Sequence, residues 1–254
     1  MDRDFADDYD LLNTNNYENY KYSYQVNKLR IKLKIKRTNV KLIKTKHLDL
    51  HKRKIRLLPP EIGLLTNLRT LDLCKNKLKS LPPEIGLLTK LRCIDVFENR
   101  IRLLPPEIGL LTKLEEIYLS CNGIKSLPKE IGLLTKLEKF TPHTNRLESL
   151  PAEIGLLTKL RRLEINKNEL QFLPAEIGFL SNLRTLEIMQ NRLKSLPPEI
   201  MSFANIKSLF LNENKLRSLP PEIGSLINLE TLDVCRNSLE YLPSEIGLLT
   251  SLQG

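Results

Sequence analysis

Leucine and isoleucine recur at fixed intervals along most of the chain, and one pattern of apolar and polar residues returns every 23 residues. In the stretch that begins at Leu68, apolar and polar residues alternate around Leu71 and Leu73, which is typical of a half-buried strand. Pro82 and Pro83 cannot donate to a sheet, so the strand must end before them. The apolar residues that follow allow about one helical turn. Each unit is therefore predicted to be a short strand, a turn and a helical or 3-10 segment.

The repeated unit occurs nine times between residues 45 and 251. A fixed period of this length indicates a solenoid, in which each coil buries its apolar residues against the next. We therefore expect an α/β repeat solenoid with a parallel sheet. An asparagine also returns with the period, at Asn76, Asn99, Asn122, Asn145, Asn168, Asn191, Asn214 and Asn237.

The asparagine column and the leucines are predicted to have separate structural roles. About seven apolar side chains per copy should turn inward, each contributing roughly 2 kcal/mol before chain entropy is subtracted. Each asparagine amide offers donors and an acceptor to backbone groups that face inward where the strand ends. We expect each Asn→Ala substitution to cost roughly 1–2 kcal/mol.

The repeat resembles the 23-residue typical type of leucine-rich repeat, written LxxLxLxxNxLxxLPxxIxxLxx. The turn Leu-Pro-x-Glu-Ile-Gly resembles the intracellular Ras-group family, which includes scribble and erbin. This resemblance implies a horseshoe with a parallel sheet on its concave face and short helical or 3-10 turns on its convex side. It also implies a non-enzymatic scaffold or adaptor that binds other proteins, with intracellular signalling as its setting.

Three positions per strand are expected on the concave face, and these positions vary between copies. Phe97 and Tyr118 fall on adjacent strands, with His143 on the next, so they predict an exposed aromatic patch. Aromatic and Arg residues with a polar surround are typical of binding hot spots. We predict that a protein or peptide docks there; the alternative is that the aromatic residues only stabilise cross-strand packing. The candidate partner-binding residues are Arg92, Asp95, Phe97, Glu116, Tyr118, His143, Glu164 and Phe210.

Charge is unevenly distributed: the net charge is +10, yet residues 1–20 sum to −5, residues 21–57 to +13 and residues 58–254 to +2. We expect residues 1–20 to be a disordered acidic tail. The alternation in residues 29–36 predicts a strand, so residues 21–44 are interpreted as a basic N-terminal cap before the repeats at 45–254. Two other interpretations of the basic residues stay open: contact with nucleic acid or an anionic membrane through residues 28–56, and nuclear targeting. A nucleic-acid-associated adaptor resembling the leucine-rich part of Ccr4-type deadenylase complexes is thus the alternative function.

Three departures from the repeat carry further predictions. Pro142 stands where an inward strand leucine belongs, so we expect a bulge at residues 141–143. The chain stops as a tenth copy opens, which predicts an uncapped end that a partner covers or that is a natural truncation. The residue after Ile-Gly is apolar in most copies; it predicts either packing within each turn or a convex stripe for self-association, at Leu64, Leu87, Leu110, Leu133, Leu156, Phe179 and Leu248.

The remaining residues give no reason to expect catalysis, a cofactor or a metal. Four Cys and three His form no zinc-like spacing, and no phosphate-binding or nucleophile motif occurs. The N-terminus lacks the apolar run of a signal peptide, and no stretch approaches the roughly 20 apolar residues of a membrane span. We therefore expect a cytoplasmic protein with reduced thiols, with the nucleus as the alternative location.

Overall fold

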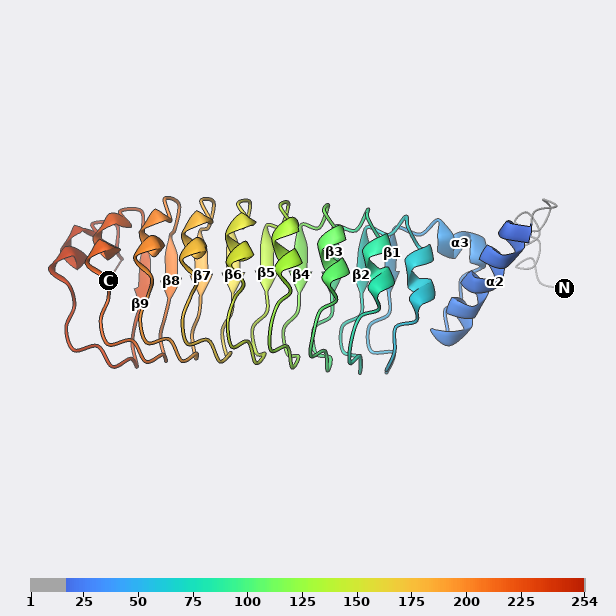
Figure 1. Ribbon diagram of the computed structural model, residues 1–254, viewed down its shortest axis with the longest axis horizontal. Coiled ribbons are helices and arrows are strands. Elements are labelled where there is room, and N and C mark those ends of the chain that lie inside the picture. The colour runs from blue at the N-terminus through green and yellow to red at the C-terminus, as the bar shows by residue number, and fades with distance from the viewer. Residues whose placement is uncertain (1–16, 254) are drawn as a thin grey trace.

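The computed structural model describes residues 17–253, in which two helices precede nine stacked coils (Figure 1). The helices are α2 (Tyr17–Lys32) and α3 (Asn39–Ile43). The strands are β1 (His47–Asp49), β2 (Thr70–Asp72), β3 (Cys93–Asp95), β4 (Glu116–Tyr118), β5 (Lys139–Thr141), β6 (Arg162–Glu164), β7 (Thr185–Glu187), β8 (Ser208–Phe210) and β9 (Thr231–Asp233). The 3-10 turns are η1 (Pro60–Leu64), η2 (Pro83–Leu87), η3 (Pro106–Leu110), η4 (Lys129–Leu133), η5 (Ala152–Leu156), η6 (Ala175–Phe179), η7 (Pro198–Ser202), η8 (Pro221–Ser225) and η9 (Ser244–Leu248).

The nine strands of the described residues form one parallel sheet in chain order, β1 to β9. Each strand pairs with the next in a register set by the repeat, so that Leu71 lies beside Ile94 and Ile94 beside Ile117. The 3-10 turns lie on the opposite side of the coils from the strands (Figure 1). The predicted solenoid fold is confirmed.

One continuous core runs through the coils, because each layer of leucines is covered by the next. In the copy that begins at Leu68, the side chains of Leu68, Leu73, Leu78 and Ile85 have no solvent exposure. In the strands before the last, the central residue is buried, and the residue before it is at least partly exposed. We call the solvent side of the sheet, predicted above as the concave side, the sheet face.

The asparagines join each coil to the one before it. The Asn76 side-chain nitrogen donates to the carbonyls of Leu50 and Leu73 at 2.9 and 2.8 Å. Its side-chain oxygen accepts the backbone N–H of Ile55 at 2.9 Å. The other seven asparagines bond in the same way, from Asn99 to Asn237. Backbone groups that the sheet leaves without partners are satisfied by this column.

A residue with a left-handed backbone precedes the asparagine position in every coil, including the first, where Arg53 stands in place of asparagine, and none of these residues is glycine. Thr144 is β-branched and has φ 54°, a conformation that such a residue rarely adopts. We expect Thr144→Gly to stabilise the protein by about 1 kcal/mol, because glycine removes the steric cost. Chemical denaturation would measure the gain, and an unchanged midpoint would show that the turn is not strained.

The N-terminal segment differs from the prediction. Residues 17–32 form helix α2, so the strand predicted over 29–36 is wrong. Val26, Leu29 and Leu33 are buried as one helical stripe, whereas Ile31, which the alternation placed with them, is exposed. The longer helical pattern prevails over the short alternation. Residues 17–20 belong to α2 and not to the predicted tail, and residues 1–16 of that tail lie outside the described residues.

No bulge forms at Pro142, so that prediction is also wrong. Phe140 pairs with Leu163, and beyond the proline the N–H of Thr144 still donates to Asn166 at 2.7 Å, in the register of the other coils. The copy keeps its 23 residues, so there is no extra residue to accommodate. The proline shortens the ladder between β5 and β6 to two pairs.

Candidate functional site

The aromatic side chains predicted to bind a partner lie on the sheet face. Phe97 and Tyr118 are half-buried there, and neither belongs to the core. The ammonium of Lys75 lies 5.9 Å from the centre of the Phe97 ring, and that of Lys139 lies 4.8 Å from the centre of the Tyr118 ring. Both rings therefore hold a cation on the sheet face.

A hollow of about 210 Å³ opens in the sheet beside these rings. It is lined by Asp95, Phe97, Tyr118, Ser120, Lys139, Thr141, His143 and Glu164. Five of the eight candidate residues thus meet at one depression. Ser120, Lys139 and Thr141 were not among the predicted residues, although Thr141 interrupts an otherwise largely acidic column and so indicates the place.

One wall of this hollow is formed by Tyr118, whose hydroxyl links the charged side chains of Glu116 and Lys139. The Tyr118 hydroxyl donates to the Glu116 carboxylate at 2.8 Å and accepts from the Lys139 ammonium at 3.2 Å. Burial raises the pKa of Tyr118, and the Glu116 hydrogen bond raises it further. Tyr118 is therefore held as a neutral phenol, fixed in position by two neighbours.

Small side chains form the floor of the hollow. The Ser120 hydroxyl donates to the Thr141 carbonyl at 2.5 Å, and both residues are buried. The Thr141 hydroxyl oxygen is buried and has no hydrogen-bond partner among the described residues. A buried polar atom without a partner costs free energy.

A second hollow, of about 380 Å³, continues the first across β6, β7 and β8. His143 and Glu164 line both hollows, so the two adjoin. At its far end the Asn212 side-chain oxygen is also buried without a partner. The sheet face therefore carries a trough from β3 to β8, with one unpaired polar atom in its middle, at Thr141, and one near its far end, at Asn212.

Four aspartates of the acidic column have a local structural role. In Asp49, Asp72, Asp95 and Asp233 the carboxylate accepts the backbone N–H two residues later, at 2.7 to 3.0 Å. Burial raises the pKa of Asp95, and the negative charge of Asp72 raises it further. The hydrogen bond from the Phe97 backbone N–H acts in the opposite direction and lowers it. These hydrogen bonds close the ends of the strands.

The other three candidate residues lie outside the two hollows. Arg92 pairs with Glu115 at 3.0 Å, and Glu116 reaches the first hollow only through the Tyr118 hydroxyl. Phe210 lies on β8, beside Glu187 of β7. The structure thus concentrates the candidate site on β3 to β6.

The titratable side chains near β1 to β3 give little support to a catalytic nucleophile or a metal site. Burial raises the pKa of Cys93 to about 12, with Glu116 and Asp95 adding to the effect. That thiol stays protonated near neutral pH and is a poor nucleophile. Ligand atoms of His51, Asp72 and Cys74 lie within 4.8 Å of one another, one residue short of a four-ligand zinc site. The absence of a metal stays a prediction.

The apolar residues after Ile-Gly are half exposed on the turn side. Leu87, Leu110, Leu133 and Leu156 are each between 51 and 53% exposed, although Leu87 also packs over Gly63 of the preceding turn. The contact with Gly63 supports packing between the turns, and the exposure supports a convex apolar stripe. Self-association through that stripe stays a prediction. No helix within residues 17–253 is long and apolar enough to cross a membrane.

Stacked parallel strands, an asparagine column and 3-10 turns define a leucine-rich repeat solenoid. A family model described as a leucine-rich repeat region matches residues 32–137, and one described as leucine rich repeat matches residues 181–239. The chain is a leucine-rich repeat protein. No curated protein matches it.

Solved structures of the same class resemble the chain. A leucine-rich repeat protein of Leptospira interrogans is 35% identical over 88% of this chain, with a TM-score of 0.73. The plant peptide hormone receptor RGFR1, in complex with RGF2, is 25% identical over 79% (TM-score 0.67). The ectodomain of the Arabidopsis thaliana receptor kinase GASSHO1/SCHENGEN3, in complex with CASPARIAN STRIP INTEGRITY FACTOR 2, is 33% identical over 78% (TM-score 0.64). This chain spans 62%, 38% and 28% of their respective lengths.

Proposed function

We propose that this protein is a non-enzymatic interaction module that docks a protein or peptide segment in the trough on its sheet face. The observation that carries the proposal is the pair of adjoining hollows, the first of which is walled by Phe97 and Tyr118. Asp95, Lys139 and Glu164 also line the first hollow, so it offers charged groups as well as aromatic rings to a peptide. Two of the similar solved structures are complexes of plant receptors with RGF2 and CASPARIAN STRIP INTEGRITY FACTOR 2.

An intracellular setting belongs to the same proposal. All four cysteines are free, which fits a reducing compartment. The Leu-Pro-x-Glu-Ile-Gly turns support kinship with the Ras-group proteins and, through it, a role in signalling in the cytoplasm. Placing the protein by fluorescence in its own cells would test the location.

The sheet-face variant tests the proposal. We expect Phe97→Ala with Tyr118→Ala to weaken retention of a bound protein by at least about tenfold, because aromatic hot spots contribute 2 kcal/mol or more. Partners retained from lysate on the immobilised protein would be identified by mass spectrometry, and their affinity would then be measured with purified components.

A matched control removes a phenylalanine and a tyrosine elsewhere. Phe172 and Tyr241 are exposed, by 57 and 64%, and lie outside the strands. Phe172→Ala with Tyr241→Ala should leave retention unchanged. If the sheet-face variant loses stability but binds its partners as the parent does, the aromatic residues serve cross-strand packing alone and the proposal fails.

A further inference from the structure

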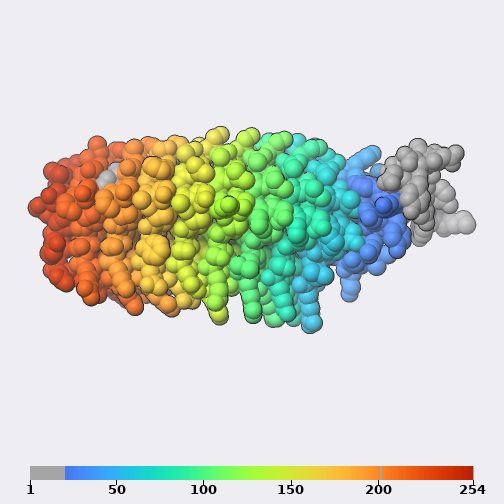
Figure 2. Space-filling model, viewed as in Figure 1, coloured from blue at the N-terminus to red at the C-terminus, as the bar shows by residue number. Residues whose placement is uncertain are grey.

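Cations gather along one edge of the first coils. In each coil, the first and third residues after the asparagine position lead from the strand to the 3-10 turn. Through the first five coils these positions hold eight basic residues, which we call the basic flank: Lys54, Arg56, Lys77, Lys79, Arg100, Arg102, Lys125 and Arg146. Long side chains project along the lower edge of the cyan-to-green part of the molecule in Figure 2.

The cations stand side by side because the backbone joins the coils at this edge. The N–H of Arg102 donates to the Lys79 carbonyl at 3.4 Å, and the N–H of Lys125 donates to the Arg102 carbonyl at 3.3 Å. Hydrogen-bonded neighbouring chains lie about 4.8 Å apart, so these side chains form a row with repulsion between its members. A polyanion that lies along the row would relieve this repulsion.

None of the eight side chains is paired with a carboxylate within the described residues. In the first five coils these positions hold Glu148 as their one acidic residue, against eight cations. In the last four coils they hold Glu169 and Glu240 against Arg192, Lys194, Lys215 and Arg217, and Arg192 pairs with Glu169 at 3.1 Å. The excess of positive charge is therefore greatest in the first five coils.

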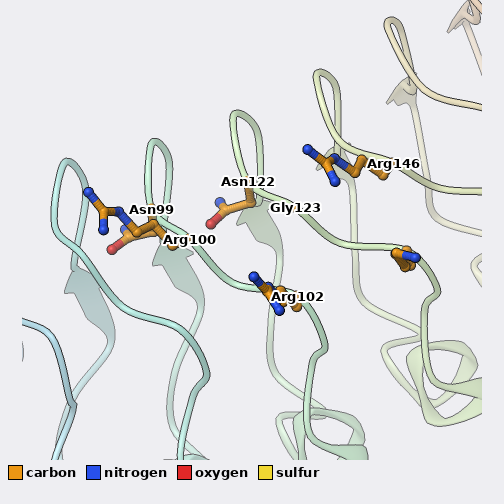
Figure 3. A pocket seen from close by; sticks show the side chains of 7 residues that line it. Asn99, Arg100, Arg102, Asn122, Gly123 and Arg146 are labelled. Atoms are coloured by element: carbon orange, nitrogen blue, oxygen red, sulfur yellow. The ribbon is translucent and has the colours of Figure 1, made fainter.

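A hollow of about 530 Å³ opens in the middle of the basic flank. Gly123 stands there in place of a basic residue, and Figure 3 shows Arg100 and Arg146 on either side of the coil that carries it. Arg102 and Lys125 also line the hollow, together with Asn99 and Asn122. Four cations thus surround a space that no acidic or aromatic side chain enters.

We propose that the basic flank binds the phosphodiester backbone of a nucleic acid. Phosphates recur at every nucleotide as the cations recur at every coil, and the Arg guanidinium can bind phosphate oxygens in pairs. An acidic protein fits less well, because the hollow lacks the apolar or aromatic anchor of a protein interface. No aromatic side chain lines it for base stacking, so binding is independent of sequence. This surface is separate from the trough on the sheet face.

Fluorescence anisotropy with a fluorescein-labelled 15-nucleotide oligothymidylate tests the proposal, with the whole chain in a salt series. About five phosphate contacts predict a log–log salt slope of about −3.5 for a single strand. Arg100→Ala with Arg102→Ala should weaken binding by about 20-fold at 0.1 M salt and make the slope less steep by about 1.4, since two contacts are lost.

Lys215→Ala with Arg217→Ala is the matched control, because it removes the same charge at the same two positions of a later coil. It should leave affinity within about twofold. An equal loss in both variants, or no saturable binding at 50 mM salt, would overturn the proposal. So would competition by a 15-residue polyglutamate as strong as that by unlabelled oligonucleotide, or recruitment to phosphatidylserine vesicles that depends on Arg100 and Arg102 in the same way. Circular dichroism melting of both variants checks that they are folded.

Discussion

Gly155→Ala should lower the free energy of unfolding by about 3 kcal/mol, because this glycine lies where two neighbouring turns touch. A Cβ at Gly155 would stand 2.3 Å from the carbonyl oxygen of Glu176 in the next turn, a backbone atom that cannot move alone. Forcing extra atoms into a packed contact typically costs 1–3 kcal/mol. The change lies in the middle of the stack, so each half must shift relative to the other. Urea denaturation followed by circular dichroism measures the loss.

Gly247→Ala is the control for this prediction. The same Ile-Gly pair occurs there in the last turn, but a Cβ would meet nothing within 4 Å. Alanine restricts the unfolded chain, so the control should be neutral or gain about 0.5 kcal/mol. Met201 is a natural counterpart: it replaces the glycine in η7, and η7 and η8 lie less close together than the other neighbouring turns. Equal stability of the two alanine variants would show that the turns are not held by close contact.

Asn145→Ala should cost about 3 kcal/mol, more than the sequence alone led us to expect. Its side-chain nitrogen donates to the carbonyls of Leu119, Pro142 and His143 at 3.0, 3.1 and 3.3 Å. Its oxygen accepts the N–H of Ile124 at 3.0 Å. Alanine leaves these buried groups without a partner, and each orphaned group costs of the order of 1–3 kcal/mol before relaxation. Urea denaturation of the parent and the variant measures the difference in the free energy of unfolding, provided that both unfold with the same dependence on urea concentration.

An exposed asparagine provides the comparison. Asn182 makes one side-chain bond, to the Thr158 carbonyl at 2.8 Å, at the surface. Asn182→Ala should therefore cost less than about 1 kcal/mol. If Asn145→Ala is no more destabilising than Asn182→Ala, water replaces the amide and the column is not a structural requirement.

The repeat made the coil predictable, because a unit that cannot bury Leu71 alone must stack on copies of itself. The N-terminal segment was misread for a physical reason. The eight alternating residues 29–36 fit a strand. Val26, Leu29 and Leu33, however, follow helical spacing, and all three are buried where the helix contacts the first coil. At Pro142 the missing N–H alone suggests a bulge, but the copy keeps its 23 residues and so has no extra residue to form one.

The candidate site was predictable in position but not in shape. The repeat alone placed Phe97 and Tyr118 in adjacent coils on the sheet face, although β3 ends at Asp95, two residues before Phe97. The depth of the hollow depends on how Ser120 packs on Thr141 and on where the Lys139 side chain lies. These features depend on three-dimensional side-chain packing, which the repeat pattern does not specify. The basic flank could have been found from sequence by comparing the first and third residues after each asparagine.

A photo-reactive amino acid placed at the rim of the trough tests the docking site most directly. Lys167 is exposed and lines the second hollow, and Lys136 is exposed outside the strands and both hollows. With the partner isolated by the pull-down, irradiation should give a discrete adduct from position 167 and none from position 136. Adducts from position 136 alone, or equal yields from both, would contradict docking on the sheet face.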